Sequence, residues 1–425
     1  MRFILVHAKL THILMIMRAP LFIFIPFILY SCTQPSPDYL SQAQRDISIL
    51  ASDSLEGREV GKKGETLAAA YISRRFGALG LSPAGTEGWY QPFFVKESQN
   101  PHEKAVLSAE DSLTGTSGKN VIALMDNPGE EVVVVGAHFD HLGYGGFSSL
   151  HRGDSAVHNG ADDNASGITA MFLIAEMLQQ KKLQRDVLFI AFSGEEKGLW
   201  GSNFFVKNPT VDLKKVDFMI NMDMVGRLDS AKGMAIHGTG TAPEWSQVID
   251  TTNTVNLKVI KKESGVGPSD HTSFYLQDIP VLHFFTGQHA DYHKPTDDAE
   301  LINYEGIVRI ANHITNIITH LDTQPKLSFQ KTKDESRQGP RFTVSLGVVP
   351  DYLYDGKGMR IDGISEDKPA QKAGLEKGDV VIQLGDSTVT DMMSYMRALS
   401  SFKAGDTTEV TVDRNGEKQV YDIQF

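Results

Sequence analysis

The chain has 425 residues, of which 53 are acidic and 41 basic, so its formal net charge is −12. Apolar residues make up 41% of the sequence and aromatic residues 9%, which excludes a largely disordered chain and predicts two or three domains. The basic residues form no long cluster, so we expect no nucleic-acid partner. A single cysteine excludes a disulfide framework and a thiolate zinc cluster.

The N-terminus is typical of an export signal. The segment before Leu21 contains the basic residues Arg2, Lys9 and Arg18 and no acidic residue. The apolar run that follows, from Leu21 to Tyr30, is too short to span a membrane. The sequence Leu29-Tyr30-Ser31-Cys32 resembles a bacterial lipobox. We therefore expect 1–31 to be a lipoprotein signal peptide and 32–44 a tether from a lipidated cysteine. The protein would then be exported and held in the cell envelope, in the periplasm or at the outer membrane; an ordinary secretory signal is the alternative.

Residues 45–322 have the alternating pattern of an α/β domain. Short apolar segments, buried-looking along their whole length, predict strands over Val132–Ala137, Val187–Phe192, Phe218–Met222 and Val281–Phe285. Amphipathic or helix-compatible segments between and after them predict helices over Ala165–Gln180, Pro243–Val255 and Tyr304–Leu321. Strands that alternate with helices indicate a mostly parallel mixed sheet.

The composition changes after the last of these helices. Residues 323–341 are rich in Gln, Lys, Asp, Glu and Ser and poor in apolar residues, which predicts a linker. Residues 342–425 are apolar enough, and long enough, to form a small domain of their own.

Histidines and acids collect where the predicted strands end. The blocks are His138-Phe139-Asp140, Asn159 to Gly167 with Asp162-Asp163, Ser193-Gly194-Glu195-Glu196, Asn221-Met222-Asp223, and Tyr292-His293 with Asp297. Functional sites of open α/β sheets lie at the carboxyl ends of the strands. Each block alone has a simple structural explanation, such as helix capping. Together, their oxygen and imidazole donors predict a site for zinc or a similar divalent ion.

These blocks carry a family resemblance. Their residues and their order over Tyr39–Leu321 resemble the co-catalytic dizinc aminopeptidases of metallopeptidase family twenty-eight. The resemblance implies a zinc-aminopeptidase-like α/β/α sandwich that binds two zinc ions per chain, bridged by a carboxylate and a water molecule. It implies five ligands: His138 and Asp223 for one ion, Glu196 and His293 for the other, and Asp163 as the bridge. Asp162 would not ligate.

The same resemblance implies the catalytic roles. Glu195 would be the general base, Asp140 the acid that orients His138, and Tyr292 a hydrogen-bond donor to the tetrahedral intermediate. Asp297 would support the metal-binding His293. Ser269-Asp270-His271 matches a further family motif with a supporting role, whereas the remaining histidines are interpreted as loop or core residues: His141, His151, His158, His283 and His289.

The C-terminal unit resembles a PDZ domain of the bacterial protease type. The resemblance rests on Ser345-Leu346-Gly347-Val348, Gly363-Ile364, Pro369-Ala370 and the run from Ala373 to Val381. It implies a β-rich domain whose groove accepts an extended peptide, such as a peptide or protein C-terminus. A packing module without a ligand is the alternative.

The expected function is that of an exported dizinc metallo-aminopeptidase that acts on peptides with free N-termini. A metal-bridging hydroxide would be the nucleophile and Glu195 the base. The alternatives are a glutaminyl-cyclase-like or carboxypeptidase-like zinc enzyme of the same fold, and a binding protein whose PDZ domain carries the function.

Overall fold

The computed structural model describes most of the chain from residue 38 on. Residues 39–44, expected to be tether, instead form the start of a helix whose apolar side packs on the core, with Ala43 buried. The described residues are 38–96, 106–109, 115–146, 148–333, 344–351, 354, 356–365 and 367–425. The expected signal peptide, Cys32 with its expected lipidation, and residues 334–341 of the expected linker lie outside them. Within these ranges, no helix has both the length and the apolar character needed to cross a membrane.

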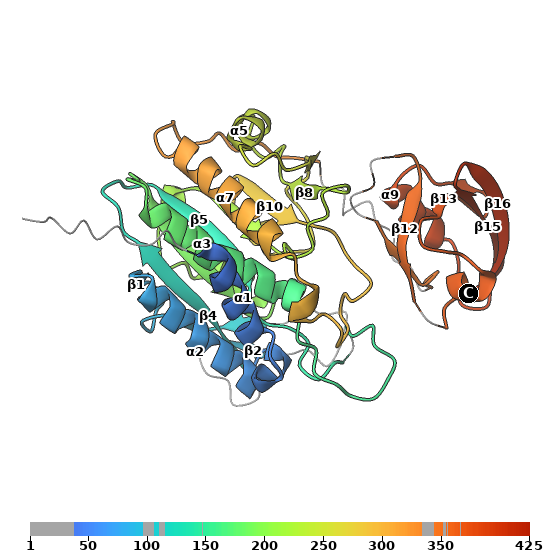
Figure 1. The fold of residues 1–425 in the computed structure, drawn as a ribbon, viewed down its shortest axis with the longest axis horizontal. Helices are drawn as coiled ribbons and strands as arrows, with labels where there is room; N and C mark the ends of the chain where they lie inside the picture. The colour runs from blue at the N-terminus through green and yellow to red at the C-terminus, as the bar shows by residue number, and fades with distance from the viewer. Residues whose placement is uncertain are drawn as a thin grey trace, which may run out of the picture. The chain divides into compact units, whose positions relative to one another are not determined.

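Residues 38–333 form an α/β unit (Figure 1). Its strands are β1 Ser82–Pro83, β2 Tyr90–Lys96, β3 Val106–Ser108, β4 Thr116–Met125, β5 Val132–His138, β6 Asp186–Phe192, β7 Val216–Met222, β8 Met234–His237, β9 Val259–Lys262 and β10 Val281–Phe285. Its α-helices are α1 Tyr39–Leu50, α2 Lys63–Ala78, α3 Gly167–Gln179, α4 Trp200–Lys207, α5 Trp245–Thr252, α6 His271–Tyr275 and α7 Tyr304–Leu321. Short helical turns are η1 Asp53–Arg58, η2 Ala161–Ser166, η3 Leu213–Lys215 and η4 Ala299–Leu301.

These strands form one mixed sheet with a parallel centre. The order is β3-β2-β4-β6-β5-β7-β10-β8-β9, and β1 pairs with β4. The adjacent strands β6, β5, β7 and β10 pair in parallel, whereas β4 joins β6 and β8 joins β10 in antiparallel fashion. The four strands predicted from the sequence are the four central parallel strands, because strands buried on both faces are apolar throughout.

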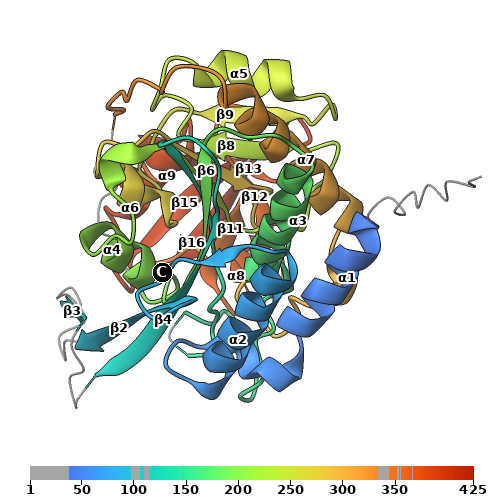
Figure 2. The same ribbon diagram turned by 90° about the vertical axis from the view of Figure 1, so that its left-hand side faces the viewer.

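Helices cover both faces of this sheet, as Figure 2 shows. Successive side chains of β5 point to opposite faces. Val133 and Val135 belong to the core that α1, α2, α3 and α7 cover. Val132 and Val134 belong to a second core with residues of α4 and α6. The molecule therefore contains the expected α/β/α sandwich.

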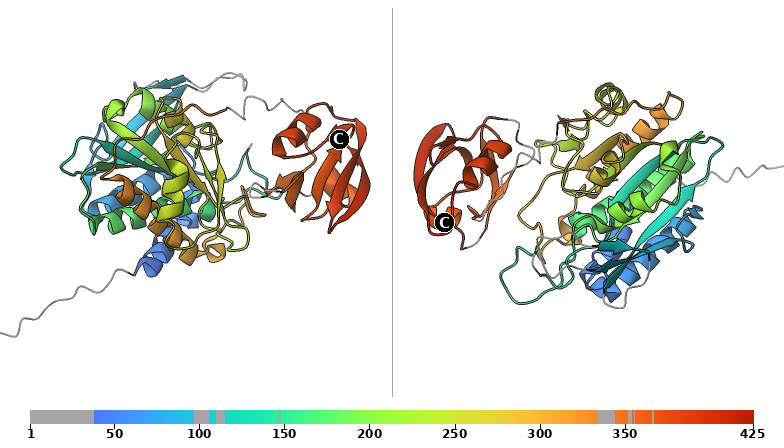
Figure 3. Two further views of the ribbon diagram at one scale, coloured as in Figure 1. Left: turned by 90° about the horizontal axis from the view of Figure 1, so that it is seen from above. Right: turned by 180° about the vertical axis from the view of Figure 1, so that it is seen from behind.

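The C-terminal unit is β-rich and has a core of its own (Figure 3). Its elements are β11 Val348–Pro350, β12 Met359–Ile364, α8 Pro369–Ala373, β13 Val380–Leu384, β14 Ser387–Thr388, α9 Met392–Leu399, β15 Thr407–Arg414 and β16 Glu417–Gln424. The strands pair in antiparallel fashion in the order β11-β12-β13-β15-β16, with β14 beside β13.

The segment after α7 differs from the sequence prediction of a linker. The Leu327 side chain is buried, and its backbone N–H donates a hydrogen bond to Asp217 Oδ1 at 2.7 Å. The Thr332 N–H donates to the Tyr275 hydroxyl at 2.9 Å. This part of the expected linker therefore belongs to the α/β unit. The reason is that a few well-placed apolar and backbone groups suffice to dock a segment whose average composition is polar.

Candidate metal centre

Three parallel strands end side by side at one edge of the sheet. His138 is the last residue of β5 and is paired with Phe192, the last residue of β6. Gly136, two residues earlier, is paired with Asn221 near the end of β7. The loops that follow β6 and β7 therefore start beside His138, so residues far apart in the sequence meet there.

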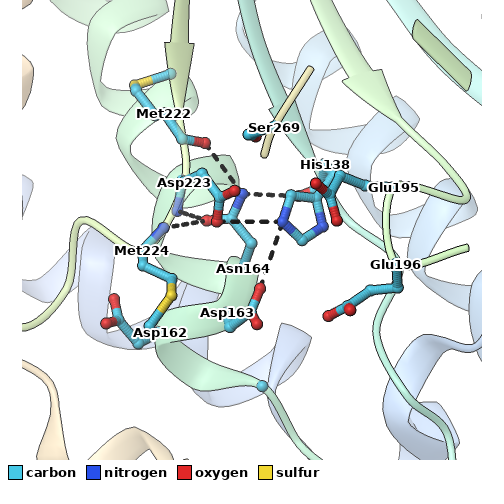
Figure 4. Close-up of polar contacts among 12 residues, drawn as sticks. His138, Asp162, Asp163, Asn164, Glu195, Glu196, Met222, Asp223, Met224 and Ser269 are labelled. Carbon is cyan, nitrogen blue, oxygen red and sulfur yellow. Dashed lines mark hydrogen bonds and ion pairs between the residues drawn. The ribbon is translucent and has the colours of Figure 1, made fainter. Parts of the chain in front are cut away.

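The first group of possible metal donors contains His138, Asp163 and Asp223 (Figure 4). His138 Nε2 lies 3.3 Å from Asp223 Oδ1 and 3.4 Å from Asp163 Oδ1. The imidazole is fully buried, and Asp163 is nearly so. These distances are typical of neighbouring ligands around one ion whose metal–ligand bonds are about 2 Å long.

The second group of possible metal donors contains His141, Asp163 and Glu196, so it shares Asp163 with the first. His293 is a neighbour of both carboxylates of this group. His293 Nε2 lies 3.3 Å from Asp163 Oδ2 and 3.2 Å from Glu196 Oε2. The other ring nitrogen of His293 is 2.8 Å from the Ser148 carbonyl oxygen, to which it can donate. With Nδ1 engaged in this way, Nε2 is the ring nitrogen that faces the carboxylates and could bind a metal ion. The two oxygens of Asp163 thus face two different donor groups.

The chemistry of these donors fits zinc. Two imidazoles and three carboxylates converge in a largely buried space, where uncompensated negative charge is costly. Zinc binds imidazole nitrogen and carboxylate oxygen readily, and the single cysteine of the chain is not among the donors. The structure therefore brings together all five residues that the resemblance implied as ligands: His138, Asp163, Glu196, Asp223 and His293.

Asn164 attaches the turn that carries Asp163 to the sheet. Its side-chain amide donates to the carbonyl oxygens of His138 at 3.2 Å and Met222 at 3.0 Å, the last residues of β5 and β7. Its Oδ1 accepts the N–H groups of Gly167 and Met224 at 3.0 and 3.2 Å. One buried side chain thus fixes the spacing between two strand ends and the turn, as the dashed lines in Figure 4 show.

Asp162 lies outside both donor groups, although it directly precedes Asp163. Its Oδ1 accepts hydrogen bonds from the Gly226 N–H at 2.6 Å and the Ser166 hydroxyl at 3.0 Å. Its Oδ2 lies 3.2 Å from His289 Nε2. The two neighbouring acids therefore have different partners, and Asp162 ties the turn to the loop after β7.

Asp297 contacts a different part of the site from the one expected. Its Oδ2 accepts the N–H groups of Asp162 and Asp163 at 2.9 and 3.1 Å, and its Oδ1 lies 3.2 Å from an Arg227 nitrogen. Support for the His293 ring comes instead from a backbone carbonyl group. Asp297 holds the backbone of the turn because that turn presents two N–H groups in succession to one carboxylate.

Asp140 connects the end of β5 to the acidic pair after β6. Its carboxylate accepts the N–H of Glu195 at 3.1 Å and that of Glu196 at 3.4 Å. His138 Nδ1 lies nearer to the Asp140 carbonyl oxygen, at 3.3 Å, than to the carboxylate, at 3.8 Å. The side chain of Asp140 therefore positions Glu195 and Glu196. Its backbone carbonyl group, more than its carboxylate, contacts the His138 imidazole.

The two acids of the pair have opposite protonation behaviour. Burial raises the pKa of Glu195 well above its ordinary value, and the attraction to His138 only partly opposes this. Burial and Asp163 also act to raise the pKa of Glu196, but His293 and hydrogen bonds from two histidines lower it to about 2. Glu195 is suited to accept a proton, and Glu196 is suited to remain an ionised ligand.

Tyr292 lies against the second donor group. Its ring stacks on His293 with 3.8 Å between the ring centroids. Burial, together with the surrounding carboxylates, raises the pKa of the Tyr292 hydroxyl well above its ordinary value. The hydroxyl therefore stays protonated and is available as a hydrogen-bond donor.

Sequence reasoning missed two residues at this site. His141 was interpreted as a loop or core residue, but its Nδ1 lies 2.9 Å from Glu196 Oε1. Arg58 had no assigned place, yet its buried guanidinium donates to the carbonyl oxygens of Phe139, Asn159 and Gly160 at 2.7, 2.6 and 2.9 Å. The available signal for His141 was its position directly after the first block. A single arginine far from every block offers no such signal.

The fold and the site define a class: an α/β metal-dependent hydrolase with imidazole and carboxylate donors at the carboxyl ends of parallel strands. The family model "Peptidase family M28" matches residues 120–318, and the model "PDZ domain" matches residues 317–425. The α/β part of the chain therefore matches the model of peptidase family M28, and the C-terminal part matches that of a PDZ domain, as the sequence predicted.

Known proteins resemble the chain mainly over the α/β unit. Aminopeptidase YwaD of Bacillus subtilis is 23% identical over 303 residues, which are 65% of this chain and 63% of that protein. The chain thus spans less than two thirds of the length of this relative. The solved structure of BSAP, a zinc aminopeptidase from Bacillus subtilis, is 18% identical, covers 71% of this chain and 98% of that one, and has a TM-score of 0.53.

The fold is also shared with an enzyme of another class. The crystal structure of Porphyromonas gingivalis glutaminyl cyclase matches with a TM-score of 0.51 and 17% identity, over 66% of this chain and 98% of that one. At such identities the likeness concerns the fold, so the reaction has to be argued from the site.

Proposed function

We propose that this protein is an exported zinc aminopeptidase that binds two metal ions and removes residues from the free N-termini of peptides. The observation that carries the proposal is the pair of donor groups that share Asp163, with one of its oxygens turned to each group. The match of residues 120–318 to the model of peptidase family M28 and the likeness to aminopeptidase YwaD support the same reaction class.

Each donor group would hold one zinc ion. His138 and Asp223 would bind the first, Glu196 and His293 the second, and Asp163 would be shared. Zinc held by these residues would supply Lewis-acid chemistry, which polarises a carbonyl group and lowers the pKa of bound water. Asn164, Asp140 and Asp297 keep the ligands in place through the backbone.

Glu195 would move the proton. Its raised pKa brings it closer to the pH at which a general base works efficiently. It takes a proton from the attacking water molecule and later gives that proton to the amine that leaves when the peptide bond breaks. Asp140 fixes the backbone of Glu195 by accepting its N–H at 3.1 Å, so that the carboxylate is held beside the donor groups.

Tyr292 would stabilise the oxyanion that forms on the attacked carbonyl group. A protonated phenol donates one hydrogen bond, and such donors act most strongly where charge develops in the transition state. The carboxylates of the site would attract the positively charged α-amino group of a substrate, which favours cleavage at the N-terminus of a chain.

Export and the PDZ domain complete the proposal. The lipobox-like sequence ending at Cys32 supports attachment to the cell envelope, in the periplasm or at the outer membrane. The PDZ domain supports capture of a peptide or protein C-terminus by strand addition. Substrates would then be peptides of the exported compartment.

Release of an amino acid from unblocked substrates tests the reaction. The purified protein, loaded with zinc, is incubated with a set of aminoacyl nitroanilides and with their N-acetylated forms. We expect turnover of the unblocked forms and none of the blocked ones. Inductively coupled plasma mass spectrometry should give two zinc ions per chain. Loss of activity with a chelator should be reversed by added zinc.

Other outcomes would contradict the proposal in different ways. Ring closure of an N-terminal glutamine in place of hydrolysis identifies a cyclase, and cleavage at blocked N-termini or from the C-terminus identifies another peptidase. A protein that binds zinc and peptides but turns over none of these substrates is a binding protein. A single zinc ion per active chain would refute the shared bridge.

A further inference from the structure

His141 follows the first block of the site, and its backbone, its Nδ1 atom and its ring each contact neighbouring residues. The side chain is fully buried. Its backbone N–H donates to the carbonyl oxygen of Arg58 at 3.3 Å, and the Arg58 guanidinium in turn donates to the carbonyl oxygen of Phe139 at 2.7 Å. The ring packs edge-on against His293, with 5.8 Å between the ring centroids. His141 thus has little freedom to move relative to the donor groups.

The two oxygens of Glu196 have different partners. Oε2 lies 3.2 Å from His293 Nε2, which is itself 3.3 Å from Asp163 Oδ2. His293 Nε2 thus lies beside one oxygen of each carboxylate, at distances typical of neighbouring ligands of one ion. Oε1 lies 2.9 Å from His141 Nδ1, whereas Asp163 Oδ2 is 3.9 Å from that nitrogen. One oxygen of Glu196 therefore faces the donor group and the other faces His141.

The hydrogen bond between these residues has a defined direction. An ionised carboxylate only accepts hydrogen bonds, so the proton lies on His141 Nδ1. At 2.9 Å the contact has the length of a charge-assisted hydrogen bond. A carboxylate held this way at one oxygen cannot rotate freely or exchange its two oxygens.

We propose that His141 is a positioning residue of the second metal site, which donates a hydrogen bond to Glu196 Oε1 and so keeps Oε2 turned toward the ion. The inference rests on the two-metal aminopeptidase proposed above. Hydrogen bonds from residues around a site to its ligands typically account for 10- to 100-fold in metal affinity. His141 acts through Glu196 and touches neither the substrate nor the reacting atoms.

Two substitutions separate positioning from ligation. His141→Asn places an amide NH₂ close to the position of Nδ1, so it retains a donor but removes the imidazole nitrogen. His141→Leu removes both the donor and the nitrogen while filling similar space. His313→Leu is the matched control, because His313 is another fully buried histidine, on α7, and its side chain bonds to the Ile249 carbonyl oxygen.

The measurement is metal affinity, determined by chelator competition on the full-length protein, together with the visible spectrum of the Co²⁺-loaded form. We expect His141→Leu to lower the affinity for one of the two ions by roughly 10- to 100-fold. His141→Asn should retain most of the wild-type affinity and leave the Co²⁺ spectrum unchanged. The control His313→Leu should keep both the wild-type affinity and the wild-type spectrum. Thermal unfolding of the metal-free variants shows whether a loss of affinity is merely a loss of fold.

Three results would overturn the inference. If His141→Asn loses as much affinity as His141→Leu and the Co²⁺ spectrum changes, His141 is itself a ligand. If neither variant loses affinity, the histidine only packs. If both variants lose affinity in proportion to a lower unfolding temperature, and the control shows the same relation, the role of His141 is structural. A wild-type protein that binds fewer than two ions refutes the proposed function instead, before any variant is compared.

Discussion

Glu195 and Glu196 are adjacent in the chain but face different chemistry. The backbone N–H groups of both point at the Asp140 carboxylate, and their side chains then diverge. Glu196 meets two histidines, which keep it ionised with a pKa of about 2, whereas Glu195 is buried next to other acids and its pKa is raised. The surroundings thus suit Glu196 to be a metal ligand and Glu195 to be a base, although the two side chains are identical.

Replacing the proposed base tests this division. Glu195→Gln keeps the size of the side chain but cannot take a proton. We expect both metal ions to remain and turnover to fall by about 10²- to 10⁴-fold, the usual contribution of a general base. Glu300→Gln, an exposed position on η4, is the matched control. Near-wild-type turnover of Glu195→Gln would remove this residue from the mechanism.

The acidic pair in the turn η2, Asp162 and Asp163, gives a second test. Asp163→Asn removes the charge that both donor groups share, so we expect both metal ions to be lost or greatly weakened. Asp162→Asn should retain the ions, because its Oδ1 bonds to a backbone N–H and a hydroxyl group outside the donor groups. Metal-to-protein ratios of the two purified variants decide between them. The reverse pattern would mean that the bridge lies one residue earlier.

At the level of helices and strands, the sequence predicted the central parallel strands of the sheet and missed its antiparallel strands. The central strands β5, β6, β7 and β10 were predictable because burial on both faces requires continuous apolar runs. The pairing of β4 with β6, in contrast, is antiparallel, and the antiparallel strands at the sheet edges went unpredicted. Their side chains face two environments, and such mixed patterns resemble those of loops.

The candidate site was partly predictable for a similar reason. His138 and Asp223 directly follow apolar strands, so their place at the sheet edge could be inferred from the sequence alone. The partners of Asp297, His141 and Arg58 could not, because they depend on how loops from distant parts of the chain pack. Arg58, for example, reaches Phe139 and Gly160 across 81 and 102 residues of sequence.

The short turn η1 contributes the buried Arg58 to the site. The guanidinium is buried, and burial lowers its pKa to about 10, so it stays charged. We expect Arg58→Met to lower the free energy of unfolding by about 3 kcal/mol, since several charge-assisted hydrogen bonds are lost and their acceptors stay buried. Metal affinity should fall as well, because the loops carrying His138 and Asp163 lose their common anchor.

Arg58→Lys distinguishes charge from geometry. A lysine retains the positive charge but lacks the planar fork that serves several carbonyl groups at once. Unfolding temperature and metal affinity should therefore both stay well below wild type, with Arg74→Met, an exposed position on α2, as the control. Full recovery by lysine would mean that Arg58 acts only through its charge near the acidic residues.

On the scale of the whole molecule, the chain contains two units with separate cores. The core of the C-terminal unit is built from its own residues, among them Leu346, Val381 and Val410. The five candidate ligands all come from the α/β unit. The boundary lies later than the composition implied, because Arg185 of the α/β unit donates to the Gln324 carbonyl oxygen at 2.6 Å and Leu327 is buried.

Two truncated chains test both the boundary and the division of labour. A chain ending at Lys333 keeps the docked segment, and we expect it to bind metal and to hydrolyse small aminoacyl amides like the full-length protein. A chain ending at Thr323 loses the buried Leu327 side chain, which alone contributes about 2 kcal/mol, so its unfolding temperature should be lower. Equal stability of the two would show that the segment does not belong to the α/β unit.

The longer truncated chain also shows what the PDZ domain adds. Small amides need the metal site alone, whereas a long peptide held by its C-terminus gains from a high effective concentration near that site. We therefore expect the chain ending at Lys333 to keep kcat/KM for small amides but to process long peptides less well than the full-length protein. The comparison uses one peptide series of increasing length, with free and amidated C-termini. If small-amide turnover disappears while the truncated chain stays folded, the PDZ domain helps to form the active site, and capture at a distance is the wrong explanation.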